Sequence, residues 1–564
     1  MIIRKIADIG RTYRHVQRYR EILSVLFKYG FDDLIDGLRV GGHLDIGWHL
    51  ISRERREQIA SLSRAERVRM AIEELGPSFV KMGQIVSTRP DFLPVEILTE
   101  LARLQDNVTP VPFSELRPII EEELKAPLGE IFEEIDEEPL ASASLGQVHR
   151  AVLPGGQQVV TKVQRPNIRK RIEVDLEILL HLATLLETHV EGWETQHPAR
   201  IVEEFGRTLD RELDYVVEGS HLERFAAQFV EEPTVYVPRL YRELTTSRVL
   251  TMEYVEGVKP TRIDLLEEAG LDRREVARRG ADLIMKQVFV HGFFHADPHP
   301  GNVLVLPDNV ICYLDYGMMG RLGRSSRETF AELILAIAGH DAARSARTLQ
   351  DLTLWEDPPD QRALEADLDE FVGLHFYRPL KELQLGKLLH QLLQLADRHR
   401  LQVSPDLFLM LKALSTAEGV GRVLDSDFDF IKQAKPFVRR MEIERYDPRR
   451  IASSAWSSGS EFAHLLGALP GEARELLRQL RKGRVRIEFE HRGLEPLVAA
   501  QERVSNRMAF AIVLAALIIG SSLIVLAGLP PQWHEIPVVG LTGYVISALM
   551  GFWLLLAIWR HGKM

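Results

Sequence analysis

Two long apolar runs without charged side chains stand close together near the end of the chain. Residues 508–528 read MAFAIVLAALIIGSSLIVLAG, and residues 538–559 read VVGLTGYVISALMGFWLLLAIW. About 20 consecutive apolar residues in a helix span the hydrocarbon core of a bilayer. The link at 529–537 is short and holds two adjacent prolines. The pattern therefore predicts a transmembrane helical hairpin, with a buried hairpin in a soluble core as the alternative.

Basic residues flank both sides of this hairpin. Arg503 and Arg507 precede it, and Arg560, His561 and Lys563 follow it. Positive charge next to a membrane span is typical of the cytoplasmic side. We therefore expect both ends of the hairpin, and the body of the chain, to lie in the cytoplasm.

The rest of the chain has the composition of a soluble body. With 70 basic and 81 acidic residues, the 564-residue chain carries a formal net charge of −11, which argues against a general nucleic-acid binder. The single cysteine, Cys312, excludes a disulfide framework and any multi-cysteine metal site. Residues 1–60 are basic and helical in pattern, and either pack on the body or contact anionic lipid.

Short strand-like runs and turns are concentrated in one stretch of the body and include residues 131–135. A long helical period at residues 199–228 lies within this stretch, and the chain after it is mostly helical. This order predicts an α+β fold with a cleft between two lobes. We expect six segments: a basic helical region (1–60), a helical extension (61–130), a smaller sheet-containing lobe (131–258), a larger helical lobe (259–440), a helical tether (441–505) and the two transmembrane helices (508–559).

The densest polar cluster reads HADPHPGN at residues 295–302, followed by DYG at residues 315–317. A carboxylate, an amide and a second carboxylate after a strand fit Mg–nucleotide chemistry, since Mg²⁺ prefers oxygen ligands. Asn302 and Asp315 are candidate metal ligands, and Asp297 can orient or deprotonate an attacking hydroxyl. Zinc bound by the two histidines, and a polar turn without function, stay open as alternatives.

A strand lysine and a loop of small residues lie upstream of this cluster. Lys162 stands in the β-rich run VVTKV, where a solvent-facing strand lysine is the plain alternative. The loop consists of Ala141, Ser142, Ala143 and Ser144, whose small side chains let backbone N–H groups approach phosphates. Loop, lysine, D-x-x-x-x-N and D-x-G follow the order of protein kinases, although the loop lacks the kinase glycines.

Two further motifs carry a family resemblance. The stretch KMGQ contains Lys81 and Gln84, and the stretch ELD contains Glu212 and Asp214. Together with the ASAS loop and HADPHPGN, they resemble the motifs of the UbiB family (AarF/UbiB atypical kinase-like proteins), in consistent order from about residue 60 to 330. The resemblance implies an atypical bilobal protein-kinase-like fold with an N-terminal helical extension and a C-terminal transmembrane hairpin.

The resemblance also implies roles for individual residues. Lys162 would contact the nucleotide phosphates, and Glu218, on the same helical run as Glu212, would be its ion-pair partner. Asp297 would be the catalytic aspartate. The nucleotide site would further include the small-residue loop and the hinge at residues 252–255, where Glu253 and Val255 present backbone groups to adenine.

In this family Lys81 and Gln84 reach over the active site, and Lys81 is expected to pair with Glu212. A helix in the groove where a kinase would hold a peptide favours a small acceptor over a protein. Ser142 replaces an alanine of the usual loop and places a hydroxyl near the phosphates.

The function implied by the resemblance is that of an ATP- and Mg²⁺-dependent ATPase or kinase supporting ubiquinone, or related isoprenoid quinone, biosynthesis at the bacterial inner membrane. ATP hydrolysis would be coupled to handling lipid precursors. One alternative is a phosphotransferase acting on a protein or a small hydroxyl compound, and another is a non-catalytic ATP-binding scaffold. The implied partners are membrane lipids or isoprenoid quinone precursors and quinone-biosynthesis enzymes, and a homodimer is compatible with the resemblance.

Overall fold

The computed structural model forms two compact units, Met1–Ala452 and Ser453–Met564. It describes residues 16–31, 59, 62–90, 93–104, 108–189, 197–355, 357–376, 385–445, 495–528, 530–533 and 536–561. Most of the predicted basic region at 1–60, most of the tether at 441–505, and Lys563 lie outside these residues. The segment boundaries expected above stay predictions.

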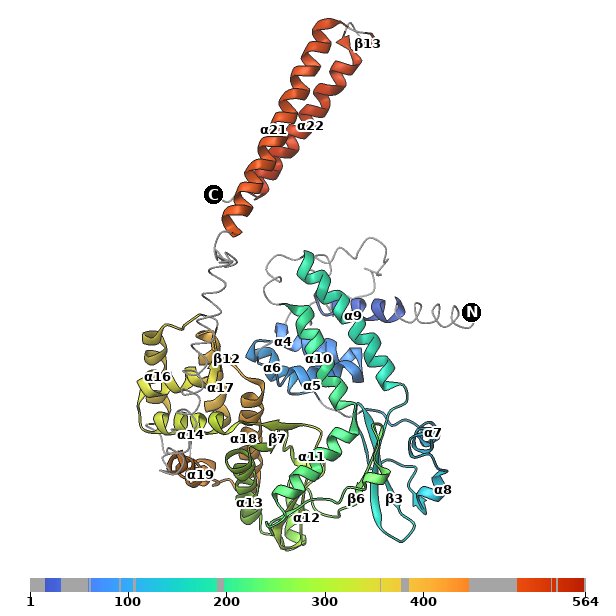
Figure 1. Ribbon diagram of the computed structural model, residues 1–564, viewed down its shortest axis with the longest axis vertical. Coiled ribbons are helices and arrows are strands. Elements are labelled where there is room, and N and C mark those ends of the chain that lie inside the picture. The colour runs from blue at the N-terminus through green and yellow to red at the C-terminus, as the bar shows by residue number, and fades with distance from the viewer. Residues whose placement is uncertain are drawn as a thin grey trace, which may run out of the picture. The chain divides into compact units, whose positions relative to one another are not determined.

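The N-terminal extension is helical (Figure 1), as the sequence predicts. Ser63 caps the first of its helices through a capping box with Glu66. Gly76, with φ 95°, ends this helix, and a proline at the next position begins another. The helices are α4 (Arg64–Leu75), α5 (Pro77–Val86) and α6 (Val95–Leu101).

Two long helices pack against this extension. They are α9 (Ile168–His189) and α10 (Pro198–Glu212). Phe79 of α5, Ile172 of α9 and Leu209 of α10 belong to one buried cluster. This shared core fixes α5, which carries the KMGQ motif, relative to α10, which ends at the ELD motif.

A five-stranded antiparallel sheet forms the smaller lobe. Its strands run in the order β1-β3-β4-β6, and β2 pairs with β3. The strands are β1 (Glu134–Ile135), β2 (Ala141–Ser142), β3 (Gly146–Val152), β4 (Gln158–Gln164) and β6 (Val249–Glu253). Helices α7 (Phe113–Leu124) and α8 (Leu128–Ile131) belong to the core on one face of this sheet.

One strand prediction in this lobe is partly wrong. Residues 131–135 are expected to form a strand, but Ile131 ends helix α8 and only Glu134–Ile135 pairs with β3. The reason is that Leu128 and Ile131 lie on one helical turn and both pack into the buried cluster that contains the apolar side chains of α7.

Alternation along β4 places Lys162 on the face opposite α7. Val159 and Val163 are buried in the cluster that contains α7, whereas Val160 belongs to a second cluster that contains Tyr215. Because side chains alternate along a strand, Lys162 shares the face of Val160. Helix α11 (Tyr215–Gln228) packs on that face.

The single helical run expected at residues 199–228 is broken. Helix α10 ends at Glu212, Leu213 is its C-cap, and Asp214 has an extended backbone at the start of α11. The Asp214 carboxylate accepts a hydrogen bond of 3.0 Å from the backbone N–H of Val216. Asp214 is thus a helix N-cap, and Glu212 and Glu218 lie on two different helices.

The larger lobe begins with two helices and a set of short strands. The helices are α12 (Ile263–Glu268) and α13 (Arg273–Met285), followed by a π-helical turn (Lys286–His291). Strand β7 pairs antiparallel with β10, β8 pairs antiparallel with β9, and β5 pairs parallel with β9. The strands are β5 (Val235–Tyr236), β7 (Phe293–His295), β8 (Val303–Leu306), β9 (Val310–Tyr313) and β10 (Met319–Arg321).

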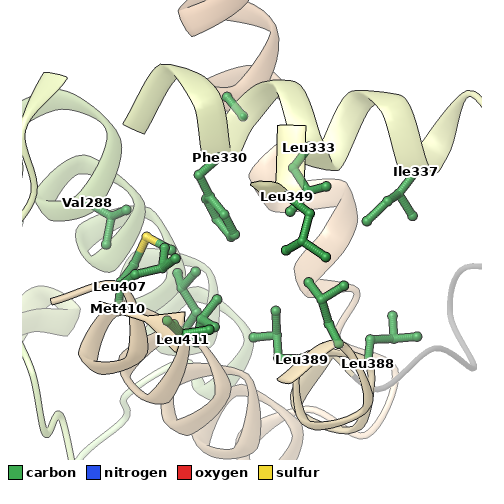
Figure 2. Packing of buried hydrophobic residues seen from close by; sticks show 14 of the residues in the cluster. Val288, Phe330, Leu333, Ile337, Leu349, Leu388, Leu389, Leu407, Met410 and Leu411 are labelled. Atoms are coloured by element: carbon green, nitrogen blue, oxygen red, sulfur yellow. The ribbon is translucent and has the colours of Figure 1, made fainter. Parts of the chain in front are cut away.

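Six helices build the remaining core of this lobe. Figure 2 shows Phe330 and Leu333 near Leu349, with Met410 and Leu411 in the same apolar cluster. The helices are α14 (Arg324–Ala338), α15 (Ala342–Leu352), α16 (Gln361–Phe376), α17 (Leu385–Arg398), α18 (Pro405–Leu424) and α19 (Phe430–Arg445). The short strands β11 (Thr353–Leu354) and β12 (Gln402–Val403) pair with each other.

The described part of the second unit is a helical hairpin. Helices α21 (Glu495–Ala527) and α22 (Val538–His561) pack closely, since a Cβ on Gly543 would collide with Ser521. The hydroxyls of Ser522 and Tyr544 are 2.6 Å apart. The link contains the paired strands β13 (Gln532–Trp533) and β14 (Ile536–Pro537).

One helix of this hairpin is long and apolar enough to cross a membrane. Met508–Ala527 has a mean hydropathy of 2.8, and only 6% of its most apolar window is buried within the protein. The described part of the partner helix contains a shorter apolar stretch, Val538–Trp553.

Candidate functional site

A cavity of about 140 Å³ contains most of the residues singled out from the sequence. Its wall is built by both lobes and by the N-terminal extension. The lining residues with polar or charged side chains are Lys81, Gln84, Ser87, Ser144, Lys162, Glu212, Tyr215, Glu218, His295, Asp297, Asn302, Asp315 and Lys412.

Lys162 forms the central ion pair of this cavity. Its Nζ donates to both carboxylate oxygens of Glu218, at 2.9 and 2.8 Å, and lies 3.7 Å from Oδ2 of Asp315. Burial lowers the pKa of Lys162, but the attraction of Asp315 and Glu218 outweighs it and holds that pKa well above its ordinary value. Lys162 therefore stays a cation that bridges β4, α11 and the DYG segment.

Asp315 stays ionised although its surroundings are partly desolvated, and its side chain is 43% exposed. Burial raises its pKa, but the Lys162 cation and the backbone N–H of Gly317, 2.8 Å from Oδ1, bring that pKa down to about 2. Glu218 behaves differently, because burial raises its pKa and the Lys162 cation does not offset this, while the negative charge of Asp315 raises the pKa further. The carboxylate best prepared to bind a cation is therefore that of Asp315.

His295 connects the HADPHPGN and DYG segments. Its Nδ1 lies 3.1 Å from the backbone N–H of Asp297, and its Nε2 lies 2.7 Å from the carbonyl oxygen of Asp315. These partners require an acceptor at Nδ1 and a donor at Nε2, which is the neutral imidazole. Burial lowers the pKa of His295, in agreement with that form. His295 thus holds Asp297 and Asp315 in a fixed relation.

The KMGQ motif closes one side of the cavity. Lys81 Nζ lies 2.9 Å from Oε2 of Glu212, as expected for the pair. Gln84 Nε2 donates to the carbonyl oxygen of Leu104 at 3.2 Å. Gly83 lies close to Leu104 and Ile72, so that a Cβ at this position would collide with Leu104. The glycine therefore lets α5 pack tightly beside the site.

Several predicted residues lie outside the cavity wall. Ser142 Oγ accepts a hydrogen bond of 2.7 Å from Arg165, which directly follows strand β4, so its hydroxyl already has a partner within the protein. Glu253 accepts from the hydroxyl of Tyr236 at 2.7 Å. The remaining predicted residues that do not line the cavity are Ala141, Asp214 and Val255, whereas Ala143 and Ser144 do line it. The nucleotide-binding roles assigned to these residues stay predictions.

The zinc alternative finds no support in the geometry of the histidines. Both ring nitrogens of His295 have partners, and Nδ1 of His299 accepts from the backbone N–H of Gly301 at 3.1 Å. Among the described residues, no three His, Cys, Asp or Glu side chains gather as a metal site would require. Mg²⁺ does not need such a set, because it uses one or two carboxylates together with phosphates and water.

Sequence reasoning did not single out three polar residues of the cavity wall, Ser87, Tyr215 and Lys412. Tyr215 is 2% exposed, and among the described residues its hydroxyl has no hydrogen-bond partner. Lys412 enters from α18, with Nζ 3.5 Å from Oδ2 of Asp297. Tyr215 directly follows the ELD motif and so had a sequence signal, but Lys412 lies in an ordinary amphipathic helix and had none.

Buried neutral histidines predict how stability depends on pH. His149 and His295 are 0% and 1% exposed, and burial lowers the pKa of both from the ordinary 6.5. Below that pH the unfolded chain binds protons that the folded chain does not, so unfolding becomes easier as pH falls. Each histidine contributes at most about 1.4 kcal/mol per pH unit.

Denaturant unfolding of the chain at pH 8, 7, 6 and 5 would measure this effect. We expect little change from pH 8 to 7 and a steady loss of stability from pH 6.5 to 5. His149→Gln, which cannot titrate, should reduce the slope. Equal stability at pH 7 and pH 5 would contradict the neutral state of these imidazoles.

Comparison with known proteins identifies the family. Residues 103–349 match an ABC1 atypical kinase-like domain, residues 368–429 a UbiB helical domain, and residues 492–560 an ABC1/UbiB kinase-like C-terminal domain. A probable protein kinase UbiB from Marinobacter nauticus is 35% identical over 93% of this chain and 96% of its own length. An uncharacterized protein encoded in the hydrogenase 1 5′ region of Clostridium pasteurianum is 30% identical over 97% of this chain and its own full length.

Among solved structures, the Rv3197–erythromycin complex from Mycobacterium tuberculosis shares 22% identity with a TM-score of 0.47, covering 66% of this chain and 95% of that one. The sequence motifs, the family domains and the full-length relatives agree with one another. The chain belongs to the ABC1/UbiB kinase-like family and has its atypical protein-kinase-like fold.

Proposed function

We propose that the chain binds Mg–ATP in this cavity and hydrolyses it, or transfers its γ-phosphoryl group, in support of isoprenoid quinone biosynthesis. The observation that carries the proposal is the ion pair of Lys162 and Glu218 next to the ionised Asp315. A partly buried lysine held by two acids supplies a fixed positive charge for nucleotide phosphates. Most of the remaining kinase-like groups line the same cavity.

The donor set fits Mg²⁺. Asp315 offers a carboxylate whose pKa is lowered to about 2, and Asn302 offers an amide oxygen in the same cavity. Hard oxygen ligands of this kind suit Mg²⁺. Mg²⁺ bound there would neutralise charge on the β- and γ-phosphoryl oxygens. Lys162 would then contact the phosphates farther from the reacting bond.

Asp297 is placed to receive the proton of the attacking group. It lines the cavity with Asn302 and is held through its backbone N–H by His295. A carboxylate in this place orients an attacking hydroxyl or water and accepts its proton. The neutral His295 keeps this carboxylate in position without competing for the proton.

The size of the cavity favours a small acceptor or water. Helix α5 closes one side through Lys81 and Gln84, and the remaining space is about 140 Å³. Ligand pockets are usually about 300–1,000 Å³. A nucleotide therefore has to displace part of the wall, and a protein segment would have to displace more. This favours ATP hydrolysis, or transfer to a small hydroxyl compound, over a protein kinase activity.

We further propose that the hairpin α21–α22 anchors the chain in the bacterial inner membrane, with the kinase-like body in the cytoplasm. The apolar window of Met508–Ala527 and its low burial support this location. Polyprenyl quinone precursors partition into bilayers, which places the substrate class next to such an anchor. Membrane lipids or quinone precursors, quinone-biosynthesis enzymes and a second copy of the chain are the partners this proposal allows.

An assay of purified full-length chain in lipid nanodiscs would test the proposed activity. Labelled γ-phosphate should appear as free phosphate, and phenol-like polyprenyl lipids should increase its release. Label on an added lipid or small hydroxyl compound would instead establish a phosphotransferase. Mg–ATP binding with neither product, together with full function of Asp297→Asn in cells, would leave only the scaffold role.

Removal of residues 505–564 should release the chain from membranes. The hairpin buries about 20 apolar residues per span in hydrocarbon, which makes insertion effectively irreversible. We expect the full chain in the membrane pellet after a high-salt wash and the shortened chain in the supernatant. Retention of the shortened chain would show that another segment, such as the basic region at 1–60, binds the membrane.

A further inference from the structure

A lysine of helix α18 reaches the part of the cavity that contains Asp297. Lys412 of α18 lines the cavity, and its Nζ lies 3.5 Å from Oδ2 of Asp297. Its neighbours Met410, Leu411 and Ala413 are at most 5% exposed within the core of the larger lobe (Figure 2). The backbone beneath Lys412 is therefore rigid, while its side chain faces the cavity.

The pair of Lys412 and Asp297 is poorly suited to a purely stabilising role. The separation of 3.5 Å exceeds the usual length of a charge-assisted hydrogen bond, about 2.7–2.9 Å. The two side chains are 24% and 36% exposed. Ion pairs with this much solvent contact contribute about 0–1 kcal/mol. A loosely held cation next to a catalytic carboxylate is free to take a better anionic partner.

Few other cationic side chains line the cavity that could bind an anionic partner. Of the described residues that line it, three are lysines and none is an arginine. Lys81 is 2.9 Å from Glu212, and Lys162 is 2.8 Å from Glu218. The loop between Asp297 and Asn302 reads PHPG and contains no lysine or arginine. Positive charge beside Asp297 thus has to come from another element, and α18 supplies it.

We propose that Lys412 contacts the γ-phosphoryl group of bound ATP and stabilises the charge on its oxygens during transfer. The inference rests on the proposed nucleotide site. In the transfer, the acceptor oxygen bonds to the γ-phosphorus while the bond to the bridging β–γ oxygen breaks. That electron pair leaves with ADP, and the acceptor proton passes to Asp297. Lys412 takes no part in the proton transfer, because its role is electrostatic.

The proposed contact should affect the binding of ATP but not that of ADP, since ADP lacks the group that Lys412 would contact. Binding of Mg–AMP-PNP and of Mg–ADP would be measured on full-length chain in detergent, for the wild type, Lys412→Ala and Lys412→Arg. We expect Lys412→Ala to weaken the ATP analogue about tenfold, the effect of losing one charge-assisted bond. Affinity for Mg–ADP should change by less than about twofold, because the contacts that ATP and ADP share do not involve Lys412.

Turnover should fall about 100-fold in Lys412→Ala, as expected for removal of one electrostatic contact to a transition state. Lys412→Arg should recover part of both losses, because the charge is kept. Lys432→Ala on α19 removes an exposed lysine from the same lobe and should change neither quantity. Thermal midpoints of all variants would verify that each is folded.

Equal losses of ATP-analogue and ADP affinity, or no loss of either, would overturn the proposed contact. Failure of the wild type to bind either nucleotide would overturn the proposed function, and the contact with it. Wild-type binding with an unchanged ratio in Lys412→Ala overturns the contact alone. The two failures are therefore distinguishable in one set of titrations.

Discussion

Asp297→Asn is expected to slow ATP turnover about 10³-fold while leaving Mg–ATP affinity nearly unchanged. Asparagine keeps the shape of the side chain but cannot accept the acceptor proton, and a positioned general base contributes about 10²–10⁴-fold. The backbone N–H that donates to His295 is retained, so the loop geometry should persist. Steady-state phosphate release and a nucleotide titration would measure the two quantities.

A matched control is available on the surface of the same lobe. Asp351 of α15 is exposed and outside the cavity, and Asp351→Asn should have wild-type turnover. Turnover by Asp297→Asn within a few-fold of the wild type would contradict a proton-accepting role. The scaffold hypothesis would then gain support, provided that nucleotide still binds.

The second large effect is on stability. Lys162→Met should lower the free energy of unfolding by about 3 kcal/mol, because it leaves the buried carboxylate of Glu218 without its cation. Glu218 is 7% exposed, and both of its oxygens accept from Lys162. Glu218→Gln should cost less, because Lys162 keeps a second acid, Asp315, at 3.7 Å. Denaturant titrations of the three proteins would give this ranking.

The double variant Lys162→Met/Glu218→Gln tests whether the loss of stability comes from breaking the ion pair or from another effect of the substitution. The double variant no longer contains the unpaired Glu218 carboxylate, and the Asp315 side chain is 43% exposed, so most of the stability should return. Nucleotide binding should not return, since the phosphate-contacting cation is gone. A double variant no more stable than Lys162→Met would show that the ion pair is not the source of the loss.

The grouping of the polar residues in the candidate site could be predicted, because these residues are close in sequence. HADPHPGN lies between strands β7 and β8, and DYG follows β9, so short local turns bring Asp297, Asn302 and Asp315 into one cavity. Lys162 could be assigned to a strand from its alternation with valines. The capping box at Ser63 and the end of helix α4 at Gly76 can likewise be predicted from short local sequence patterns.

The helix break at Asp214 was predictable in principle but was missed. An aspartate before an apolar run is a helix start signal, and Asp214 caps α11 in this way. The continuous periodicity of residues 199–228 concealed it. The break matters, because it lets Glu212 pair with Lys81 while Glu218 pairs with Lys162.

Lys412 could not have been predicted from the sequence. It lies 115 residues from Asp297, and only the packing of α18 on the larger lobe brings the two together. The same holds for the burial of the Tyr215 hydroxyl against Gly146, which depends on how α11 meets β3. Such contacts between distant elements arise from tertiary packing. The periodicity and propensity of the sequence do not reveal this packing.

Calorimetric titration of the full-length chain in detergent with Mg–ATP tests the central claim most directly. The claim predicts saturable binding that requires Mg²⁺ and that weakens at least about tenfold in Asp315→Asn, because a metal-binding carboxylate is lost. Excess EDTA should reproduce the loss in the wild type. Absence of saturable binding, or binding unaffected by EDTA and by Asp315→Asn, would contradict a Mg–nucleotide site in this cavity.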